Sequence, residues 1–282
     1  MIEDVVLSLF WPVPRYRDTT ILRVARLIRA VGRDLIGYSY LYAEFYCPQL
    51  AAPSAVFPWL SWPFYSLAWT QPQFSYTGTF YTMRDVAVLP KPWQHPHPPL
   101  HQAAATRETF AAVGTMGLGL LVALIGTPMA ELASVIAVYQ AAWQAAGHPG
   151  QGEVRLRLPI YVAETQEQAQ ADPRPSVLPY YERLRQGYLR SAQQFESAER
   201  TARAAQLASL TYEELLQERV VFGTPTDVVA RLRTVQRALG LSGFIIEPNV
   251  GGGIPLDRVA RSPDLFAHVV APQLRECNED AM

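Results

Sequence analysis

The chain has 282 residues, of which 49% are hydrophobic and 17% charged, and its formal net charge is -1. This apolar content excludes a wholly disordered chain and is sufficient for the core of one large domain. The near-neutral balance, without a basic stripe, argues against a nucleic-acid-binding surface. Cys47 and Cys277 are too few for a disulfide framework or a four-thiolate zinc site, which favours a cytoplasmic location. The acidic start at residues 1–4 is not typical of a secretory leader.

The first hundred residues contain few regular patterns. Residues 5–10 predict a buried strand, which ends at Trp11 and Pro12. Residues 74–81 alternate in polarity around Gly78 and predict a hairpin. The prolines of residues 90–99 predict an extended connector that cannot be helical.

From residue 100 onward, strands and helices are expected to alternate. The expected strands are residues 100–105, 117–125, 154–162 and 243–247. The expected helices are residues 106–114, 127–147, 164–219 with breaks at Pro173, Pro175 and Pro179, 224–240 and 262–274. Glycine, proline and Glu131 within the apolar stretch 116–138 favour a buried strand and helix over a membrane span. This order predicts an α/β fold with a parallel sheet, either part of a (β/α)₈ barrel or an open doubly wound sheet. Its ligand site should lie at the carboxyl ends of the strands.

The turn between the strand at 100–105 and the following helix is a candidate anion site. Backbone N–H groups at a helix start, together with hydroxyl and guanidinium donors, suit a phosphate. The candidate residues are Ala104, Thr106, Arg107 and Thr109. An ordinary capped helix is the alternative.

A second group of candidates follows the strand at 243–247. Glu247 and Asn249 place polar side chains at the carboxyl end of this strand, where they either orient a ligand or cap the loop. Gly251, in a run of three glycines, lets a backbone approach a ligand closely or forms a plain turn. Glu164, after the strand at 154–162, has the same two interpretations as Glu247.

A metal site is the weaker interpretation of the histidines in the connector. His95, His97 and His101 have strand-like spacing, but no carboxylate or cysteine lies nearby in sequence to complete a ligand set. We therefore expect solvated histidines on a proline-stiffened segment and no metal.

Four segments, in order, resemble the luciferase-like, flavin-dependent monooxygenases. They are the connector at 88–99, the turn at 103–110, the strand at 156–165 and the helix, strand and loop at 222–255. Together they place the resemblance over residues 71–275, with residues 1–70 matching poorly. The resemblance implies one barrel domain over residues 1–282. It also implies a TIM (β/α)₈ barrel and an oxidoreductase that uses reduced FMN or F420, with O₂ and a small organic substrate in the FMN branch.

The N-terminal region departs from this family. Residues 5–12 would correspond to the third barrel strand, so the first two strands and the active-site histidine that follows the second strand have no counterpart. Residues 36–40 stand where the family carries a glycine-rich turn with an arginine, and they lack that arginine. An incomplete barrel would leave sheet edges open and favour homo- or hetero-oligomers. The alternative function is therefore a non-catalytic barrel that binds flavin or a partner subunit.

Overall fold

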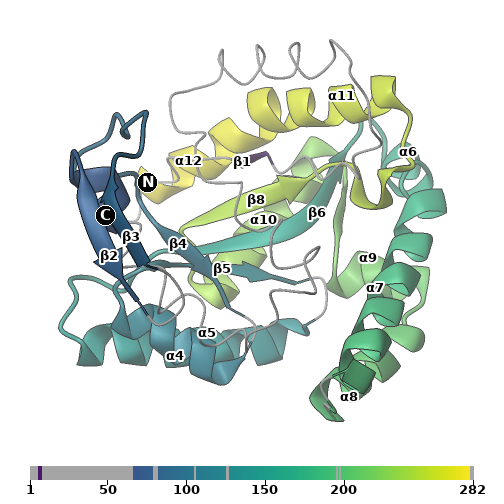
Figure 1. Ribbon diagram of the computed structural model, residues 1–282. Coiled ribbons are helices and arrows are strands. Elements are labelled where there is room, and N and C mark those ends of the chain that lie inside the picture. Colours follow the sequence, from purple (N-terminus) through teal and green to yellow (C-terminus); the bar gives the residue numbers. More distant parts are fainter. Residues whose placement is uncertain are drawn as a thin grey trace. The chain divides into compact units, whose positions relative to one another are not determined.

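The computed structural model describes residues 6–7, 66–78, 82–104, 106–124, 127–194, 196 and 198–279 (Figure 1). The chain divides into two compact units, one of Met1–Pro14 with Gln102–Met282 and one of Arg15–His101. Cys47 and residues 36–40, which stand where the family carries a glycine-rich turn, lie outside the described residues.

The larger unit contains a parallel sheet whose strands run in the order β1, β8, β6, β5, β4. These strands are β1 (Val6–Leu7), β4 (His101–Ala103), β5 (Gly119–Ala123), β6 (Val154–Val162) and β8 (Gly243–Glu247). β8 pairs with the first half of β6, and β7 (Val221–Gly223) pairs with the last residues of β6. The expected α/β architecture with a parallel sheet is therefore confirmed, and the described strands form an open run from β1 to β4.

β1 lies beside β8 in the sheet. Val6 pairs with Ile245 and Leu7 with Ile246, in parallel with β8. In a (β/α)₈ barrel the neighbours of the last strand are the seventh and the first. β1 therefore occupies the position beside the last strand that the first strand takes in a complete barrel. Its correspondence to the third strand of the family stays a prediction.

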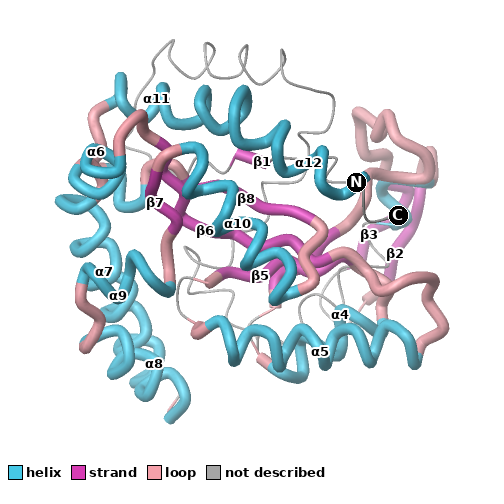
Figure 2. Tube along the Cα trace, turned by 180° about the vertical axis from the view of Figure 1, so that it is seen from behind, coloured by secondary structure: helices cyan, strands magenta, loops and turns pink. Residues whose placement is uncertain are grey.

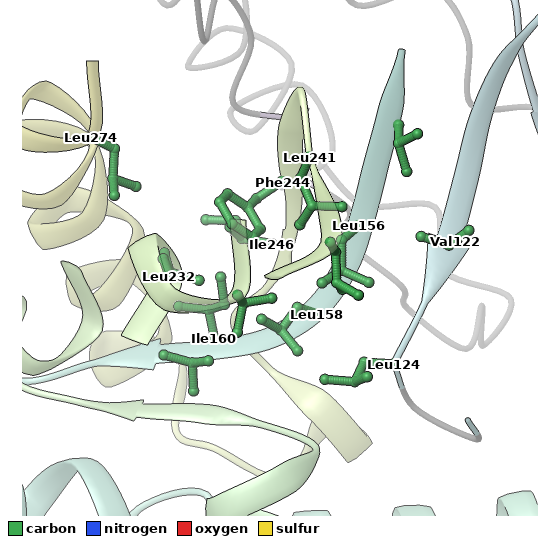
Figure 3. Packing of buried hydrophobic residues seen from close by; sticks show 14 of the residues in the cluster. Val122, Leu124, Leu156, Leu158, Ile160, Leu232, Leu241, Phe244, Ile246 and Leu274 are labelled. Atoms are coloured by element: carbon green, nitrogen blue, oxygen red, sulfur yellow. The ribbon is translucent and has the colours of Figure 1, made fainter. Parts of the chain in front are cut away.

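Helices cover one face of this sheet. They are α4 (Arg107–Thr115), α5 (Met129–Ala145), α10 (Pro225–Leu239), α11 (Leu256–Leu265), the π-helical turn η3 (Phe266–Val270) and α12 (Ala271–Glu279). Seen from behind, α10 lies in front of β6 and β8 (Figure 2). Side chains from β5, β6 and β8 meet those of α4, α5, α10, η3 and α12 in one buried cluster (Figure 3). Leu120, Leu156, Leu158 and Leu232 are all inaccessible to solvent in it.

Local sequence signals explain where α10 begins and ends. The Thr224 hydroxyl accepts a hydrogen bond from the Asp227 N–H at 3.4 Å, and Pro225 occupies the first turn. Gly240 ends the helix in the left-handed conformation, with φ of 62°. The boundaries expected from the sequence are confirmed here.

A second helical layer contains two longer helices and two short ones. They are α6 (Gln166–Ala171), α7 (Arg174–Gln194), α8 (Ala198–Ala208) and α9 (Tyr212–Glu218). The breaks expected at Pro175 and Pro179 are wrong, because α7 includes both prolines, whereas Pro173 lies in the break between α6 and α7. The expected final helix at 262–274 is also only part of the observed one, since α11 begins at Leu256 and runs through Pro263. Tertiary packing overrides the preference of proline in both helices.

In the smaller unit the expected hairpin is present. β2 (Phe74–Thr77) pairs antiparallel with β3 (Thr82–Val86), so its second strand begins one residue after the expected end. The ammonium group of Lys91 donates a hydrogen bond to the Ala68 carbonyl at 2.8 Å and thereby attaches the proline-rich connector to the segment before the hairpin. Across the described part of the chain, no helix combines the length and apolarity needed to cross a bilayer.

Candidate functional site

The second face of β6 and β8 carries charged groups in place of leucines. Side chains alternate across a strand, so Arg155 and Arg157 lie opposite Leu156 and Leu158. On β8 the same alternation separates Glu247 from Phe244 and Ile246, which belong to the helix-covered core. Arg157 pairs with Ala123, the last residue of β5, and with Ile245 in the middle of β8.

Arg157 and Glu247 form a largely buried ion pair. The distance between Arg157 Nη2 and Glu247 Oε2 is 2.8 Å, and the side chains are 22% and 5% exposed. Burial raises the pKa of the Glu247 carboxyl, and the Arg157 guanidinium opposes this shift without cancelling it. The loss of hydration therefore destabilises the charged form of Glu247 by more than the attraction to Arg157 stabilises it.

Two tyrosines of α7 lie close to this ion pair. Burial, reinforced by the Glu247 charge, raises the pKa of Tyr180 to about 12, and a hydrogen bond with Arg157 opposes the shift. The ring of Tyr181 meets that of Tyr180 edge-on, with centroids 5.5 Å apart. Both hydroxyls remain protonated at neutral pH, so both can donate hydrogen bonds to a ligand.

The loop after β8 holds α7 in this position. The Ser176 hydroxyl donates a hydrogen bond to the Val250 carbonyl at 2.9 Å. Gly251 has φ of 82°, and a Cβ added there would lie 2.3 Å from the Ser176 carbonyl oxygen. Gly251 thus approaches the backbone of α7 closely, and its predicted approach to a ligand stays a prediction.

Asn249 closes its own loop. Its side-chain oxygen accepts a hydrogen bond from the Ile254 N–H at 3.1 Å, and its carbonyl accepts one from the Gly252 N–H at 3.0 Å. Asn249 thus caps this loop and Glu247 contributes to the buried charge cluster, while the predicted role of both in orienting a ligand stays a prediction.

The predicted phosphate turn has its expected cap. The Thr106 hydroxyl accepts from the Thr109 N–H at 3.3 Å, and the two hydroxyls lie 3.0 Å apart. The N–H of Ala104 donates to the Leu121 carbonyl at 3.3 Å, so it is already used. Arg107 is exposed. Hydrogen bonds from its own N–H and from Thr106 lower the pKa of the Glu108 carboxyl, which therefore places a negative charge in the first turn.

A polar cleft of about 390 Å³ lies at the end of β6. Glu164 lines it and accepts a hydrogen bond from Arg261 Nε at 2.8 Å, and this contact lowers the pKa of the Glu164 carboxyl. Arg258, another lining residue, pairs with Asp172, which also accepts from the Tyr161 hydroxyl at 2.8 Å. Neither Glu247, Asn249 nor Gly251 lines this cleft.

The predicted site residues form two separate groups on the sheet. Ala104, Thr106, Arg107 and Thr109 follow β4, while Glu247, Asn249 and Gly251 follow β8, and β5 and β6 separate the two strands. Sequence reasoning missed Arg157, Tyr180, Tyr181 and Arg219. Two arginines in alternation within an otherwise apolar strand were a usable signal for Arg157, but tyrosines on a long polar helix give none.

The histidines of the connector show other contacts. The His97 ring lies 6.0 Å from that of Trp69, and its Nδ1 is 2.8 Å from the Pro98 carbonyl oxygen. Within the residues that the structure describes, no group of three or more His, Cys, Asp or Glu side chains could hold a metal ion.

Comparison with protein families decides the assignment. The family model for the luciferase-like monooxygenases matches residues 64–242. The chain belongs to this family. A comparison with curated proteins finds no match.

Several solved structures have the same fold as this chain. Monooxygenase RslO1 from Streptomyces bottropensis is 24% identical over 73% of this chain and 57% of that one, with a TM-score of 0.52. The oxygenating constituent of the 3,6-diketocamphane monooxygenase of Pseudomonas putida, solved with FMN, is 18% identical over 73% and 59%, with a TM-score of 0.55. The F420-dependent tetrahydromethanopterin reductase of Methanopyrus kandleri is 13% identical over 74% and 60%, with a TM-score of 0.52. The chain thus spans less than two thirds of each of these structures.

Proposed function

We propose that this chain is a flavin-dependent oxidoreductase of the luciferase-like class. It would use reduced FMN or F420 on a small organic substrate, with O₂ as co-substrate if the cofactor is FMN. Family membership supports the class. The similar structures with FMN from Pseudomonas putida and of an F420-dependent enzyme from Methanopyrus kandleri support the two cofactors.

The observation that carries this proposal is the buried polar cluster around Glu247, the last residue of β8. Arg157 of β6 and Tyr180 of α7 interact with its carboxylate. Ligand sites of parallel α/β sheets and barrels lie at this edge. Polar groups held away from water there can orient a bound ring by hydrogen bonds that need little rearrangement.

In this proposal the phosphate of the cofactor binds at the start of α4. The N-terminus of a helix carries about half a positive charge, and Thr106, Arg107 and Thr109 add side-chain donors after Ala104, whose own N–H is bonded to Leu121. This donor set fits a phosphate, although the Glu108 carboxylate competes for the same helix end. Glu247, Asn249 and Gly251 form the opposite rim.

The cofactor supplies the redox chemistry, and the protein residues supply binding and orientation. Tyr180 and Arg157 act as hydrogen-bond donors, and α7, which Gly251 holds against the loop, limits the access of water. A cytoplasmic location and homo- or hetero-oligomers complete the proposal.

Cofactor binding is the direct test. Fluorescence titration of the full chain should give saturable binding of FMN or F420. Arg107→Glu should abolish it, whereas Arg190→Glu, a matched reversal of an exposed arginine on α7, should leave it unchanged. Saturable binding that is identical in both variants would place the phosphate elsewhere.

Turnover separates the two candidate functions. With reduced FMN, O₂ and a long-chain aldehyde, the amount of product should match the amount of FMN oxidised. With F420 and a secondary alcohol, it should match the amount of F420 reduced. Saturable binding without turnover would favour the non-catalytic barrel. No binding of either cofactor would overturn the proposal.

A further inference from the structure

Arg219 is an arginine buried where its charge has little compensation. It follows α9 and precedes β7, and it is only 3% exposed. Its Nη1 donates to the carbonyl of Leu124, just after β5, at 3.3 Å. The carboxylate oxygen of Glu218 is 3.9 Å from Arg219 Nε, and the Glu218 side chain is 58% exposed. This partner is distant and solvated, so it offsets little of the cost of burying the guanidinium.

The other nearby carboxylate is already paired. Both oxygens of Glu131 accept hydrogen bonds from Arg203, at 2.6 and 2.9 Å. Arg203 brings a second positive charge toward Arg219, and burial lowers the pKa of the Arg219 guanidinium. Among the described residues, Arg219 Nε has no hydrogen-bond partner. Buried donors of this kind are rare in folded proteins and call for an explanation.

Tyr181 supplies a second donor beside Arg219. Its side chain is 3% exposed, and its hydroxyl also has no hydrogen-bond partner in the described part of the chain. The two side chains interact electrostatically, and Tyr181 belongs to the same buried cluster as Val220, the residue after Arg219, and Leu215, four residues before it. The Tyr181 hydroxyl stays protonated, because burial raises its pKa. Arg219 Nε and the Tyr181 hydroxyl are thus two buried donors without an acceptor among the described residues, on side chains that interact electrostatically.

We propose that Arg219 and Tyr181 bind an oxyanion, a carboxylate or phosphate group, at the carboxyl end of β5. One anionic oxygen can accept hydrogen bonds from Arg219 Nε and from the Tyr181 hydroxyl, and its charge offsets that of the guanidinium. This site is distinct from the start of α4 and does not depend on the proposed oxidoreductase activity.

Thermal unfolding of the full chain tests the site with inorganic phosphate and acetate as probes. Either anion should raise the unfolding midpoint in a saturable way, relative to chloride at equal ionic strength. Tyr181→Phe removes only a hydroxyl that has no partner, so it should leave the midpoint without added anion unchanged and weaken the anion response about tenfold. Arg219→Gln should remove the response, and Arg190→Gln should retain it.

The outcome is decisive even if one variant does not fold. Should Arg219→Gln fail to fold, Tyr181→Phe carries the test alone. No stabilisation of the unchanged chain beyond that given by chloride would overturn the proposal. A full anion response in Tyr181→Phe would do the same.

Paired titrations with FMN and riboflavin distinguish the source of the oxyanion, because these two ligands differ by a phosphate. If the cofactor phosphate occupies the site, inorganic phosphate should compete with FMN, and Tyr181→Phe should weaken FMN about tenfold without affecting riboflavin. If a separate anion occupies it, FMN affinity should be equal in both proteins while the phosphate response differs. If no flavin binds, the proposed function fails and the phosphate experiment still decides the oxyanion site.

Discussion

The two faces of the central sheet differ in chemistry although the same strands build both. The helix-covered face is closed by leucine, isoleucine and valine side chains, many of them without exposed surface (Figure 3). The other face carries Arg155, Arg157 and Glu247 on β6 and β8. The helix-covered face stabilises the parallel α/β fold, and the charged face holds the polar groups that can bind a ligand.

This difference has an energetic consequence. Apolar burial stabilises a fold in proportion to area, whereas buried ion pairs contribute little or cost free energy. The charged face is therefore retained at the expense of stability, which is common where residues serve binding. Substitutions on the two faces should separate these roles.

The largest expected effect is on the helix-covered face. Leu156→Ala should lower the free energy of unfolding by about 4 kcal/mol, because Leu156 is fully buried and the truncation leaves a cavity. Arg155→Ala, at the neighbouring position, should lower the free energy of unfolding by no more than about 1 kcal/mol, because Arg155 pairs with the half-exposed Glu153 at 3.2 Å. Urea unfolding with unchanged slopes measures both. Equal losses would remove the distinction between the faces.

Arg157→Met is expected to be the most destabilising change on the charged face. It leaves the Glu247 carboxylate buried without its partner and should cost about 3 kcal/mol at pH 8. The double variant Arg157→Met with Glu247→Gln should recover most of this loss, since no buried charge remains. A double variant as unstable as Arg157→Met would show that Arg157 acts through packing and not through its charge.

The loss in Arg157→Met should depend on pH. A carboxyl whose pKa is raised by folding contributes stability below its unfolded pKa, and this contribution disappears as pH rises through the folded pKa. Burial already raises the pKa of Glu247, and removal of Arg157 raises it further. The variant should therefore approach the unchanged protein in stability near pH 5 and fall behind it toward pH 8. Urea unfolding across this range checks the sign.

The sequence predicts the helix-covered face far better than the charged one. β6 lies where its alternation predicts it, and α10 begins and ends at its predicted caps, because periodicity and capping are local signals. α7 runs through Pro179, and the three-residue β7 was missed. The cluster of Tyr181 with Arg219 joins residues 38 positions apart, and no local pattern records that contact.

Gly251→Ala tests how the loop after β8 supports the charged face. The added Cβ would meet the Ser176 carbonyl oxygen at 2.3 Å, and φ of 82° is unfavourable for alanine. We expect a loss of about 2 kcal/mol and weaker cofactor binding, as α7 moves away from the strand end. Gly252→Ala is the matched control, because its φ of 77° is similar but no atom lies within 4 Å of the added Cβ. It should cost about 1 kcal/mol and leave binding unchanged.

The smallest expected effect concerns the start of α4, where an acidic residue competes with the proposed phosphate. Glu108→Gln should tighten FMN binding about threefold, because a carboxylate in the first turn opposes a phosphate at the same positive helix end. Since the pKa of Glu108 is lowered, its charge persists through mild acidity, and the gain should grow between pH 5 and 8 as the phosphate loses its second proton. Riboflavin, which has no phosphate, should bind both proteins equally. Tighter binding of riboflavin as well would mean that Glu108 acts on the ring or on the fold, and the phosphate would then have to be sought at Arg219 and Tyr181.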